Sequence, residues 1–409
     1  MRTGIDTIHH DVLPLAPACP DTGLPAGDPL ADHLGGPATG DDRELAGDER
    51  RRARAAALLG RYASDSLDPF SLRRDKSFHF AAGGFLAYRA VGRTAVVGGD
   101  PVGPPGRAGE ILRSFGDEAA ERRWSVVLDG ASPSALDAYR EAGYHCLRVG
   151  DEAVVDPRGF SLEGRAIRKV RQSVTRVRRL GWSVEVADAT ALGSGARRAI
   201  DDLESAWRER QPRMQGFAMT LGHLWGPVED RGAVFALARD PDGALRAFQR
   251  YAPYRGGLSL DVMRRDEDIA NGLNEALVVA VVARAAELGL REVSLNFAGF
   301  SHIMRPDPGT LSRGERVLRR LLGLVHGRFQ LERLAAFNAK FFPAWRPRYL
   351  VYPSAASLPR AGLRVLQAEG YLPHREREHE PARPRLAPGL PVPAAAGGLP
   401  PAPPASVAA

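Results

Sequence analysis

The order of strand and helix signals predicts a mixed α/β protein made of two similar units. Between residues 78 and 156, a hairpin, a helix, a buried strand, a second helix and further strand signals follow one another. A similar order of strands and helices returns over residues 182–299. Strands that alternate with helices are typical of α/β folds. A helix rich in arginine, over 161–181, separates the two units.

The length and the two ends set the domain boundaries. A chain of 409 residues is too long for one ordinary compact domain. Both ends are rich in proline, glycine and alanine without a sustained period, which is typical of disorder. We expect a disordered tail over 1–44, a first domain over 45–160, the linking helix over 161–181, a second, catalytic domain over 182–373 and a disordered tail over 374–409.

The first unit begins with a hairpin, GGFLAYRAVGRTAVVGGD, whose turn lies over 89–93. A helix near 107–123 and the buried strand WSVVLDG follow. Pro133 suits the first turn of a helix that opens at Ser132. The stretch HCLRVGDEAVVD, residues 145–156, is expected to form a pair of strands.

The second unit repeats these signals. WSVEVAD predicts a strand, residues 196–210 a helix, and residues 233–265 three strands, the first two joined by the turn DPDG. Apolar residues at helical spacing predict a long helix over 271–288. The strand VSLNFAG and a helix over 312–325 complete the unit.

Composition excludes several classes of protein. Cys19 and Cys146 have no partners at metal-binding spacing, so we expect neither a disulfide framework nor a metal site, and a reducing cytoplasm is the simplest setting. The N-terminus lacks the pattern of a signal peptide. The longest apolar stretch is broken by Arg284 and Glu287, so no segment is expected to span a bilayer.

The net charge of +7 favours an acidic partner such as nucleic acid, anionic lipid or a phosphorylated substrate. A genome that prefers arginine codons, with the excess charge simply solvated, is the alternative.

The helix predicted over 161–181 carries the densest positive charge, and Ser161 is its expected N-cap. One apolar stripe recurs at steps of three and four: Ile167, Val170, Val174 and Val177. The other faces hold seven cations, and a polyanion would relieve their repulsion and release counterions. The cations expected to bind tRNA or another anion are Arg165, Arg168, Lys169, Arg171 and Arg176. A solvated arginine face is the alternative, and RNA and anionic lipid are not separated.

Residues 258–282, LSLDVMRRDEDIANGLNEALVVAVV, hold the richest local chemistry. Ligands of α/β units gather where a strand gives way to a helix. Arg264 and Arg265 are candidates for binding a phosphate or carboxylate, and Asp261 and Glu275 for holding an ammonium or accepting a proton. Alternatively, Asp261 pairs with Arg264 or another neighbour, and Glu275 simply lines the helix.

The loop between this strand and helix tests one reaction class. The order of strand, loop and helix resembles that of an acyl-CoA N-acyltransferase of the GNAT kind. Such an enzyme binds the pyrophosphate of coenzyme A at a glycine-rich turn. Here the loop is RRDEDIANG, with three acids and no closely spaced glycines. The sequence therefore predicts an acyl donor other than coenzyme A.

Four stretches in this order resemble the C-terminal catalytic domain of lysylphosphatidylglycerol synthases: SLEGRAIRKVRQSVTRV, LSLDVMRRDEDIANGLNEAL, VSLNFAGF and FNAKFFPAWRPRYLVYP. VVGGDPVG in the first half also fits, and the resemblance covers roughly residues 70 to 355. It implies two tandem GNAT-like domains and transfer of an aminoacyl group, lysyl above all, from aminoacyl-tRNA to phosphatidylglycerol or a similar lipid hydroxyl. No cofactor is implied beyond aminoacyl-tRNA as co-substrate.

One departure from the family affects the acceptor. Typical full-length members carry many transmembrane helices ahead of this domain, and this sequence shows none. We expect either a lipid reached peripherally, at the inner face of the membrane, or a soluble amine or peptide acceptor. A non-catalytic tRNA- or membrane-binding module is a further alternative.

The last motif holds candidate residues for the transfer chemistry. An aminoacyl ester is already activated, so the enzyme must align the acceptor and stabilise the oxyanion. Lys340, one of three lysines in a chain with 56 basic residues, is the candidate for a compact cation at the oxyanion, with an ordinary surface lysine as the alternative. Arg348 is a candidate for the terminal adenosine phosphate. Trp345, with Phe341 and Phe342, is expected to wall the site or stack on a base, with core packing as the alternative.

The remaining candidates are less specific. Asp261 and Glu275 are expected to recognise the ammonium of the aminoacyl group. Asn271 and Asn296 are candidate substrate contacts. His302 is a candidate base or a loop residue without a role, and Lys76 is assigned no role.

Overall fold

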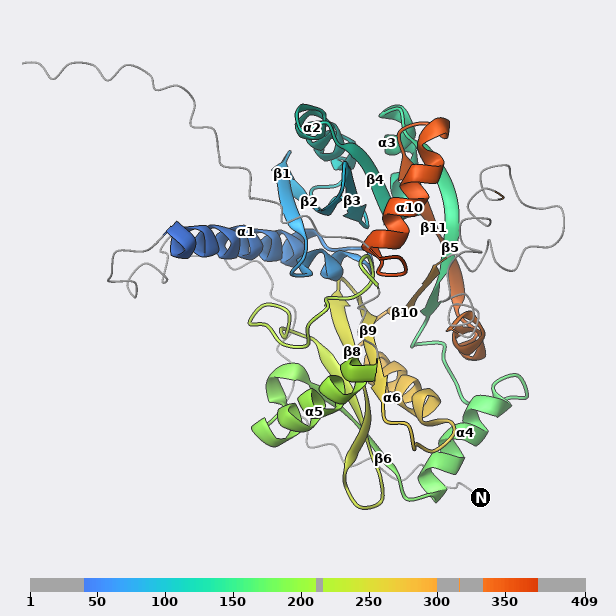
Figure 1. Cartoon of the computed structure of the whole chain (residues 1–409). Coiled ribbons are helices and arrows are strands. Elements are labelled where there is room, and N and C mark those ends of the chain that lie inside the picture. Colours follow the sequence, from blue (N-terminus) through green and yellow to red (C-terminus); the bar gives the residue numbers. More distant parts are fainter. Residues whose placement is uncertain (1–39, 211–215, 300–315, 317–333, 374–409) are drawn as a thin grey trace, which may run out of the picture. The chain divides into compact units, whose positions relative to one another are not determined.

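The computed structural model describes residues 40–210, 216–299, 316 and 334–373 (Figure 1). The chain divides after Arg50 into two units, and the sheet described below belongs to the second. Helix α1 (Gly40–Tyr62) begins within the segment predicted to be a tail. His302, the helix predicted over 312–325 except for residue 316, and most of both predicted tails lie outside the described residues.

Eleven strands form one mixed sheet in the order β1-β2-β3-β4-β11-β5-β10-β9-β8-β7-β6 (Figure 1). The first half of the chain supplies β1 (Ser77–Ala81), β2 (Gly84–Val91), β3 (Thr94–Gly98), β4 (Ser125–Ala131) and β5 (His145–Val155). The second half supplies β6 (Ser183–Asp188), β7 (Val234–Arg239), β8 (Leu245–Tyr254), β9 (Gly257–Arg265), β10 (Glu292–Gly299) and β11 (Ala344–Tyr352).

Most helices lie where the sequence predicts them, whereas α1 and α10 were not predicted. The α-helices that follow α1 are α2 (Ala108–Glu121), α3 (Leu136–Glu141), α4 (Arg168–Arg179), α5 (Ser194–Arg210), α6 (Leu273–Glu287) and α10 (Leu358–Ala368). The short 3-10 helices are η1 (Asp68–Leu72), η2 (Pro133–Ala135), η3 (Ala189–Ala191), η4 (Ala339–Phe341) and η5 (Ala355–Ser357).

The predicted α/β class with two similar halves is confirmed. In the first half, β1 to β3 are antiparallel, and α2 then leads to β4, which is parallel to β3. In the second half, β6 to β9 are antiparallel, and α6 then leads to β10, which is parallel to β9. Each half therefore has one point where a parallel strand pair is joined through a helix, which is where α/β proteins place ligands.

The last strand of each half pairs with the other half. β11 lies between β4 and β5, and β5 lies between β11 and β10. The prediction of two strands over 145–156 is wrong, because β5 is one strand of 11 residues with a partner on each side. Pro347 is tolerated in β11 because the pairing with β4 starts only at Tyr349.

Helices cover both faces of the sheet. In β7, Val234, Ala236 and Ala238 face a core formed with α6 and α4, whereas Phe235 and Leu237 face a core formed with α5. This alternation follows from the two-residue period of a strand. In the first half, α2 and α3 share one core with the sheet and α10 shares another. No helix among the described residues is both long and apolar enough to cross a bilayer.

The basic helix is shorter than predicted. α4 runs over Arg168–Arg179 and its N-cap is Ile167, so the prediction of Ser161 as N-cap is wrong. Gly164 has a φ of 85°, and this left-handed conformation is incompatible with a helix that continues back to Ser161. The predicted apolar stripe is confirmed, because Ile167, Val170 and Val177 are buried in the core.

Candidate functional site

Lys340 and Glu275 form an ion pair, with 2.7 Å between Nζ and Oε1, although 65 residues separate them in the chain. Glu275 lies in the first turn of α6, and Lys340 lies in η4. The lysine side chain is 41% exposed and the glutamate side chain is 12% exposed. The carboxylate therefore anchors an ammonium group that a ligand can still approach.

The local sequence directs Lys340 outward. Asn338 is fully buried, and its Nδ2 donates to the carbonyl of Leu295 in β10 at 3.4 Å. Phe341 is also buried, with its ring edge-on to Phe337 at 5.4 Å between centroids. With its neighbours fixed inward on both sides, the lysine between them is held at the surface of this short turn.

α4 packs beside this pair. It contacts both α6 and η4, so three segments meet near the start of α6. Gly272 caps α6 with a φ of 98°, and a Cβ at this position would lie 2.5 Å from the Cβ of Ser173 in α4. Only glycine permits this backbone conformation together with this close approach.

The face of α4 away from the core is strongly basic. Arg165, Arg168, Lys169 and Arg176 are exposed, and no hydrogen bond or ion pair reaches their side chains within the described part of the chain. Arg171 differs, because its Nη1 donates to the carbonyls of Leu162 at 2.5 Å and Gly164 at 2.9 Å. Four of the five predicted anion-binding cations are thus available to a ligand, and the fifth holds the preceding loop.

The aromatic residues of the last motif divide into two groups. Phe341 is buried, which matches the core-packing alternative. Phe342 is 62% exposed with a φ of 51°, and Trp345 is 42% exposed. Two large apolar side chains therefore remain at the surface within five residues of Lys340, where they can contact a ligand.

Asp261 lies apart from that pair. Its Oδ2 accepts from Nη1 of Arg250 at 2.7 Å, and its Oδ1 accepts from the backbone N–H of Leu221 at 2.9 Å. Both charged side chains are fully buried. No hydrogen bond or ion pair between described residues joins Asp261 to Lys340 or Glu275, and its surroundings favour a structural role.

The two predicted arginines at the end of β9 have different environments. Arg264 donates from Nε to Glu204 at 2.6 Å and stacks over the Trp207 ring at 3.7 Å. Arg265 and Asn271 are exposed, and neither side chain has a bonding partner among the described residues. Arg265 is therefore the freer candidate for a carboxylate or phosphate.

Asn296 occupies an irregular position in β10. It has a φ of 67° at a bulge between Ser294 and Phe297. Its Nδ2 donates to the carbonyls of Met219 at 2.7 Å and Leu260 at 2.8 Å. The side chain thus fastens the segment around Met219 to the sheet.

Arg348 is buried in an acidic cluster. It donates to Glu152 from Nε at 3.1 Å, to Asp65 from Nη1 at 2.9 Å and to Ser66 from Nη2 at 2.8 Å. Burial alone lowers its pKa, but the charges of Asp65 and Glu152 outweigh this and raise it above the ordinary value. This placement favours a structural role over the predicted contact with an RNA phosphate.

The surroundings of the first turn of α6 indicate whether coenzyme A could be the acyl donor. Ser173 lies against Gly272, and three acids precede the helix at 266–268. Both features disfavour a pyrophosphate at this helix end, because they add bulk and negative charge where backbone N–H groups would bind it. The described residues contain no cluster of three or more histidine, cysteine or acidic side chains suited to a metal ion.

Several residues of these clusters have weak signals in the sequence. Arg250 lies in a strand of mostly buried residues, and such a cation needs an acidic partner, so its pairing could have been inferred. Asp65 and Glu152 carry no such signal, because 283 and 196 residues separate them from Arg348. Asn338 belongs to the last motif, but its burial depends on the turn formed by η4, which the sequence does not predict.

The chain matches known proteins over most of its length. The model of the family described as "Phosphatidylglycerol lysyltransferase, C-terminal" matches residues 56–352. The lysylphosphatidylglycerol biosynthesis bifunctional protein LysX of Mycobacterium ulcerans is 36% identical over 360 residues, covering 85% of this chain and 32% of that protein. LysX of Mycobacterium tuberculosis H37Rv is 35% identical over 360 residues, covering 85% of this chain and 30% of that protein. The chain thus spans about a third of the length of these relatives.

A solved structure shares the fold. The structure of L-PGS from Bacillus licheniformis superimposes with a TM-score of 0.68 at 22% identity, covering 78% of this chain and 96% of that chain. At this identity the likeness concerns the fold alone.

Proposed function

We propose, from the premise that this chain belongs to the family of phosphatidylglycerol lysyltransferase C-terminal domains, that it transfers a lysyl group from lysyl-tRNA to phosphatidylglycerol. The observation that carries the proposal is the Lys340–Glu275 pair beside the exposed basic face of α4. In this arrangement α4 binds the polyanionic donor, and the neighbouring Lys340 provides the compact cation for the oxyanion.

The donor enters along α4. Phosphates of the tRNA bind Arg165, Arg168, Lys169 and Arg176, whose charges have no protein partner among the described residues. Trp345 and Phe342 offer exposed aromatic surface on which an unpaired base at the tRNA end can stack.

The reaction is an ester exchange. The lipid hydroxyl attacks the carbonyl carbon of the aminoacyl ester, a new C–O bond forms, and the carbonyl oxygen becomes an oxyanion. Collapse of this intermediate breaks the bond to the ribose oxygen, which takes up the proton lost by the lipid hydroxyl. The Lys340 ammonium stabilises the oxyanion, because a fixed charge is most effective where negative charge develops.

Glu275 has two tasks in this proposal. It holds Lys340 through the 2.7 Å contact, and it offers a carboxylate to the ammonium of the incoming aminoacyl group. Exposed Arg265 is available for the phosphate of the lipid headgroup. Peripheral contact with an anionic membrane surface follows from this assignment, because the headgroup must reach the protein.

A two-phase assay tests the proposal. Radiolabelled lysyl-tRNA is incubated with the protein and phosphatidylglycerol vesicles, and label is expected in the chloroform phase. Label in a soluble product would replace the lipid by an amine or peptide acceptor. Label that stays on tRNA while the protein binds it tightly would make the chain a binding module. Alanyl-tRNA in parallel tests the choice of amino acid.

A further inference from the structure

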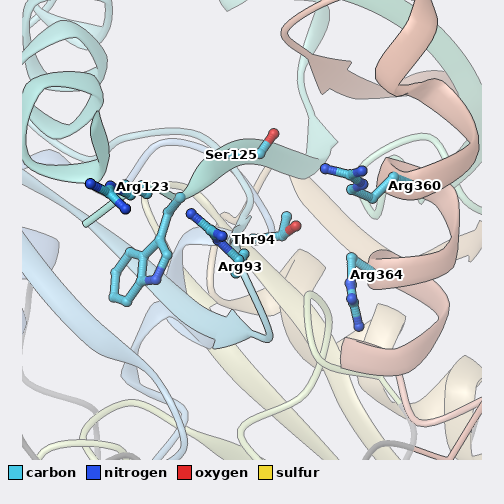
Figure 2. A pocket seen from close by; sticks show the side chains of 7 residues that line it. Arg93, Thr94, Arg123, Ser125, Arg360 and Arg364 are labelled. Atoms are coloured by element: carbon cyan, nitrogen blue, oxygen red, sulfur yellow. The ribbon is translucent and has the colours of Figure 1, made fainter. Parts of the chain in front are cut away.

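A second basic site lies at the amino-terminal end of β4, in a cavity of about 510 Å³ (Figure 2). The turn between β2 and β3, the start of β4 and one side of α10 form it. Its lining residues are Arg93, Thr94, Arg123, Trp124, Ser125, Arg360 and Arg364. Four of these seven residues are arginines and none is acidic, so the cavity concentrates positive charge.

Three of the four arginines have guanidinium groups that a ligand can reach. Arg93, Arg123 and Arg360 are exposed, and no hydrogen bond or ion pair between described residues reaches their guanidinium groups. Figure 2 shows Arg360 extending from α10 toward the strand that carries Ser125. Like charges gathered in this way repel one another, and an anion between them would remove the repulsion.

The fourth arginine is fixed in place. Arg364 packs against the turn at Gly92, where a Cβ would lie 3.2 Å from its Cζ. Gly92 has a φ of 63°, so glycine suits this position both for the conformation of the turn and for the close approach of Arg364. Nη1 of Arg364 donates to Gln367 at 2.8 Å, while its Nε is buried with no partner.

Thr94 supplies a second unpaired polar group. The residue is 1% exposed, and its buried Oγ1 has no hydrogen-bond partner. Figure 2 shows the hydroxyl on the side that faces α10. Buried polar groups in folded proteins nearly always have a partner. Two unsatisfied donors, the hydroxyl of Thr94 and Nε of Arg364, therefore lie in residues that line the cavity.

We propose that this cavity binds a phosphate group, from an anionic phospholipid headgroup or from a small phosphorylated molecule. Phosphate oxygens accept bidentate hydrogen bonds from arginine and single bonds from hydroxyl groups. A concave cavity of about 510 Å³ suits a compact phosphate better than an RNA strand, which α4 meets on an open helix face.

The site is separate from the proposed transfer site. None of its lining residues is among the residues assigned to tRNA, the aminoacyl group or the acceptor. The Lys340–Glu275 pair joins η4 to α6, whereas the cavity is formed by the turn between β2 and β3, the start of β4 and α10. The proposal therefore stands or falls independently of lysyl transfer.

Binding measurements on the full chain test it with two probes. Glycerol 3-phosphate, followed by calorimetry, represents a free phosphorylated molecule. Vesicles of phosphatidylcholine with phosphatidylserine, followed by flotation, represent a lipid headgroup without the acceptor proposed for transfer. The test variant is Arg93→Gln with Arg360→Gln, and the matched control is Arg113→Gln with Arg198→Gln, two exposed arginines outside the cavity without partners among the described residues.

The test variant is expected to weaken binding at least about tenfold, because each lost contact is a charge-assisted hydrogen bond. The control is expected to change it less than about twofold. Loss of vesicle binding identifies a lipid source, and loss of glycerol 3-phosphate binding alone identifies a free molecule. Unchanged binding of both probes would overturn the proposal.

Thr94→Val provides a second test that is independent of charge. It removes the unpaired hydroxyl at nearly constant shape, so thermal stability is expected to stay equal or rise. Binding of glycerol 3-phosphate is expected to weaken severalfold, because the phosphate loses one donor. Lower stability with unchanged binding would show that the hydroxyl serves the fold, and would count against the site.

Discussion

Two ion pairs that involve the predicted catalytic residues have opposite environments. Arg250 and Asp261 are both fully buried, and Asp261 also binds a backbone N–H of the segment at Leu221. Lys340 and Glu275 are 41% and 12% exposed, at a point where three separate segments meet. The first pair joins β8 to β9 within the sheet, and the second joins η4 to the first turn of α6.

The difference shows where a charge is free to act. A buried pair is desolvated, so each partner is held by the other and breaking it is costly. A partly exposed pair contributes little to stability, so its members can exchange partners with a ligand. We therefore expect changes at Asp261 to act on folding and changes at Lys340 to act on transfer.

The largest expected effect is on stability. Asp261→Asn leaves the buried guanidinium of Arg250 without its counter-charge, and should lower the free energy of unfolding by about 3 to 5 kcal/mol. Chemical denaturation measures this loss. As a control, Asp137→Asn breaks a pair whose side chains are 90% and 57% exposed, and should cost less than about 1 kcal/mol.

A double variant sharpens the test. Arg250→Met with Asp261→Leu removes both charges and should recover much of the lost stability. If Asp261→Asn instead kept full stability but abolished lysyl transfer, Asp261 would be catalytic and the contrast between the two pairs would fail.

The second prediction concerns Lys340. Lys340→Arg keeps the charge but replaces a compact ammonium by a planar fork, and should lower the rate of lysyl transfer at least about tenfold. The two-phase assay measures the rate, and denaturation should show unchanged stability. Arg113→Lys, a change of the same kind at an exposed site in α2, should leave the rate as it is. Equal rates for Lys340→Arg and the wild type would remove Lys340 from the mechanism.

The third prediction extends the comparison to α4, whose exposed cations have no partners in the described chain. Replacing Arg168, Lys169 and Arg176 by glutamine should flatten the slope of log affinity against log salt by about 2 for tRNA. Arg171 is spared because it bonds the loop before the helix. Titrations of tRNA at several salt concentrations measure the slope. An unchanged slope would leave α4 as a solvated face.

The sequence predicted what depends on local pattern. Apolar spacing and turn signals predicted most strands and helices of both halves, but not α1, β11 or α10. The stripe through Val170 and Val177 predicted the buried face of α4. The exchange of β5 and β11 between halves was not predictable, because strand pairing over such separations leaves no local signal.

For the candidate site, the sequence likewise predicted residue types but not their contacts or burial. Lys340 and Glu275 were both identified, but their contact depends on the turn that buries Asn338 and Phe341. Asp261 and Arg348 were identified as charged residues in informative motifs, and burial could not be read from the motif. Residue type thus predicts possible chemistry, while exposure decides whether a ligand can use it.

The smallest expected effect concerns Lys76, the buried counterpart of Lys340. It is 4% exposed, its Nζ donates to the carbonyl of Phe70 at 3.1 Å, and burial lowers its pKa from 10.5 to about 7. Between these pH values the unfolded chain binds a proton that the folded chain does not, so stability rises with pH from about 7 to 10.5. Lys76→Met should remove this dependence, by about 1 kcal/mol between pH 7.5 and 8.5. Lys169→Met, at an exposed lysine, should leave the pH dependence of unfolding unchanged. Parallel curves for wild type and Lys76→Met would mean that Lys76 keeps its ordinary pKa, and burial would then not separate the lysines of this chain.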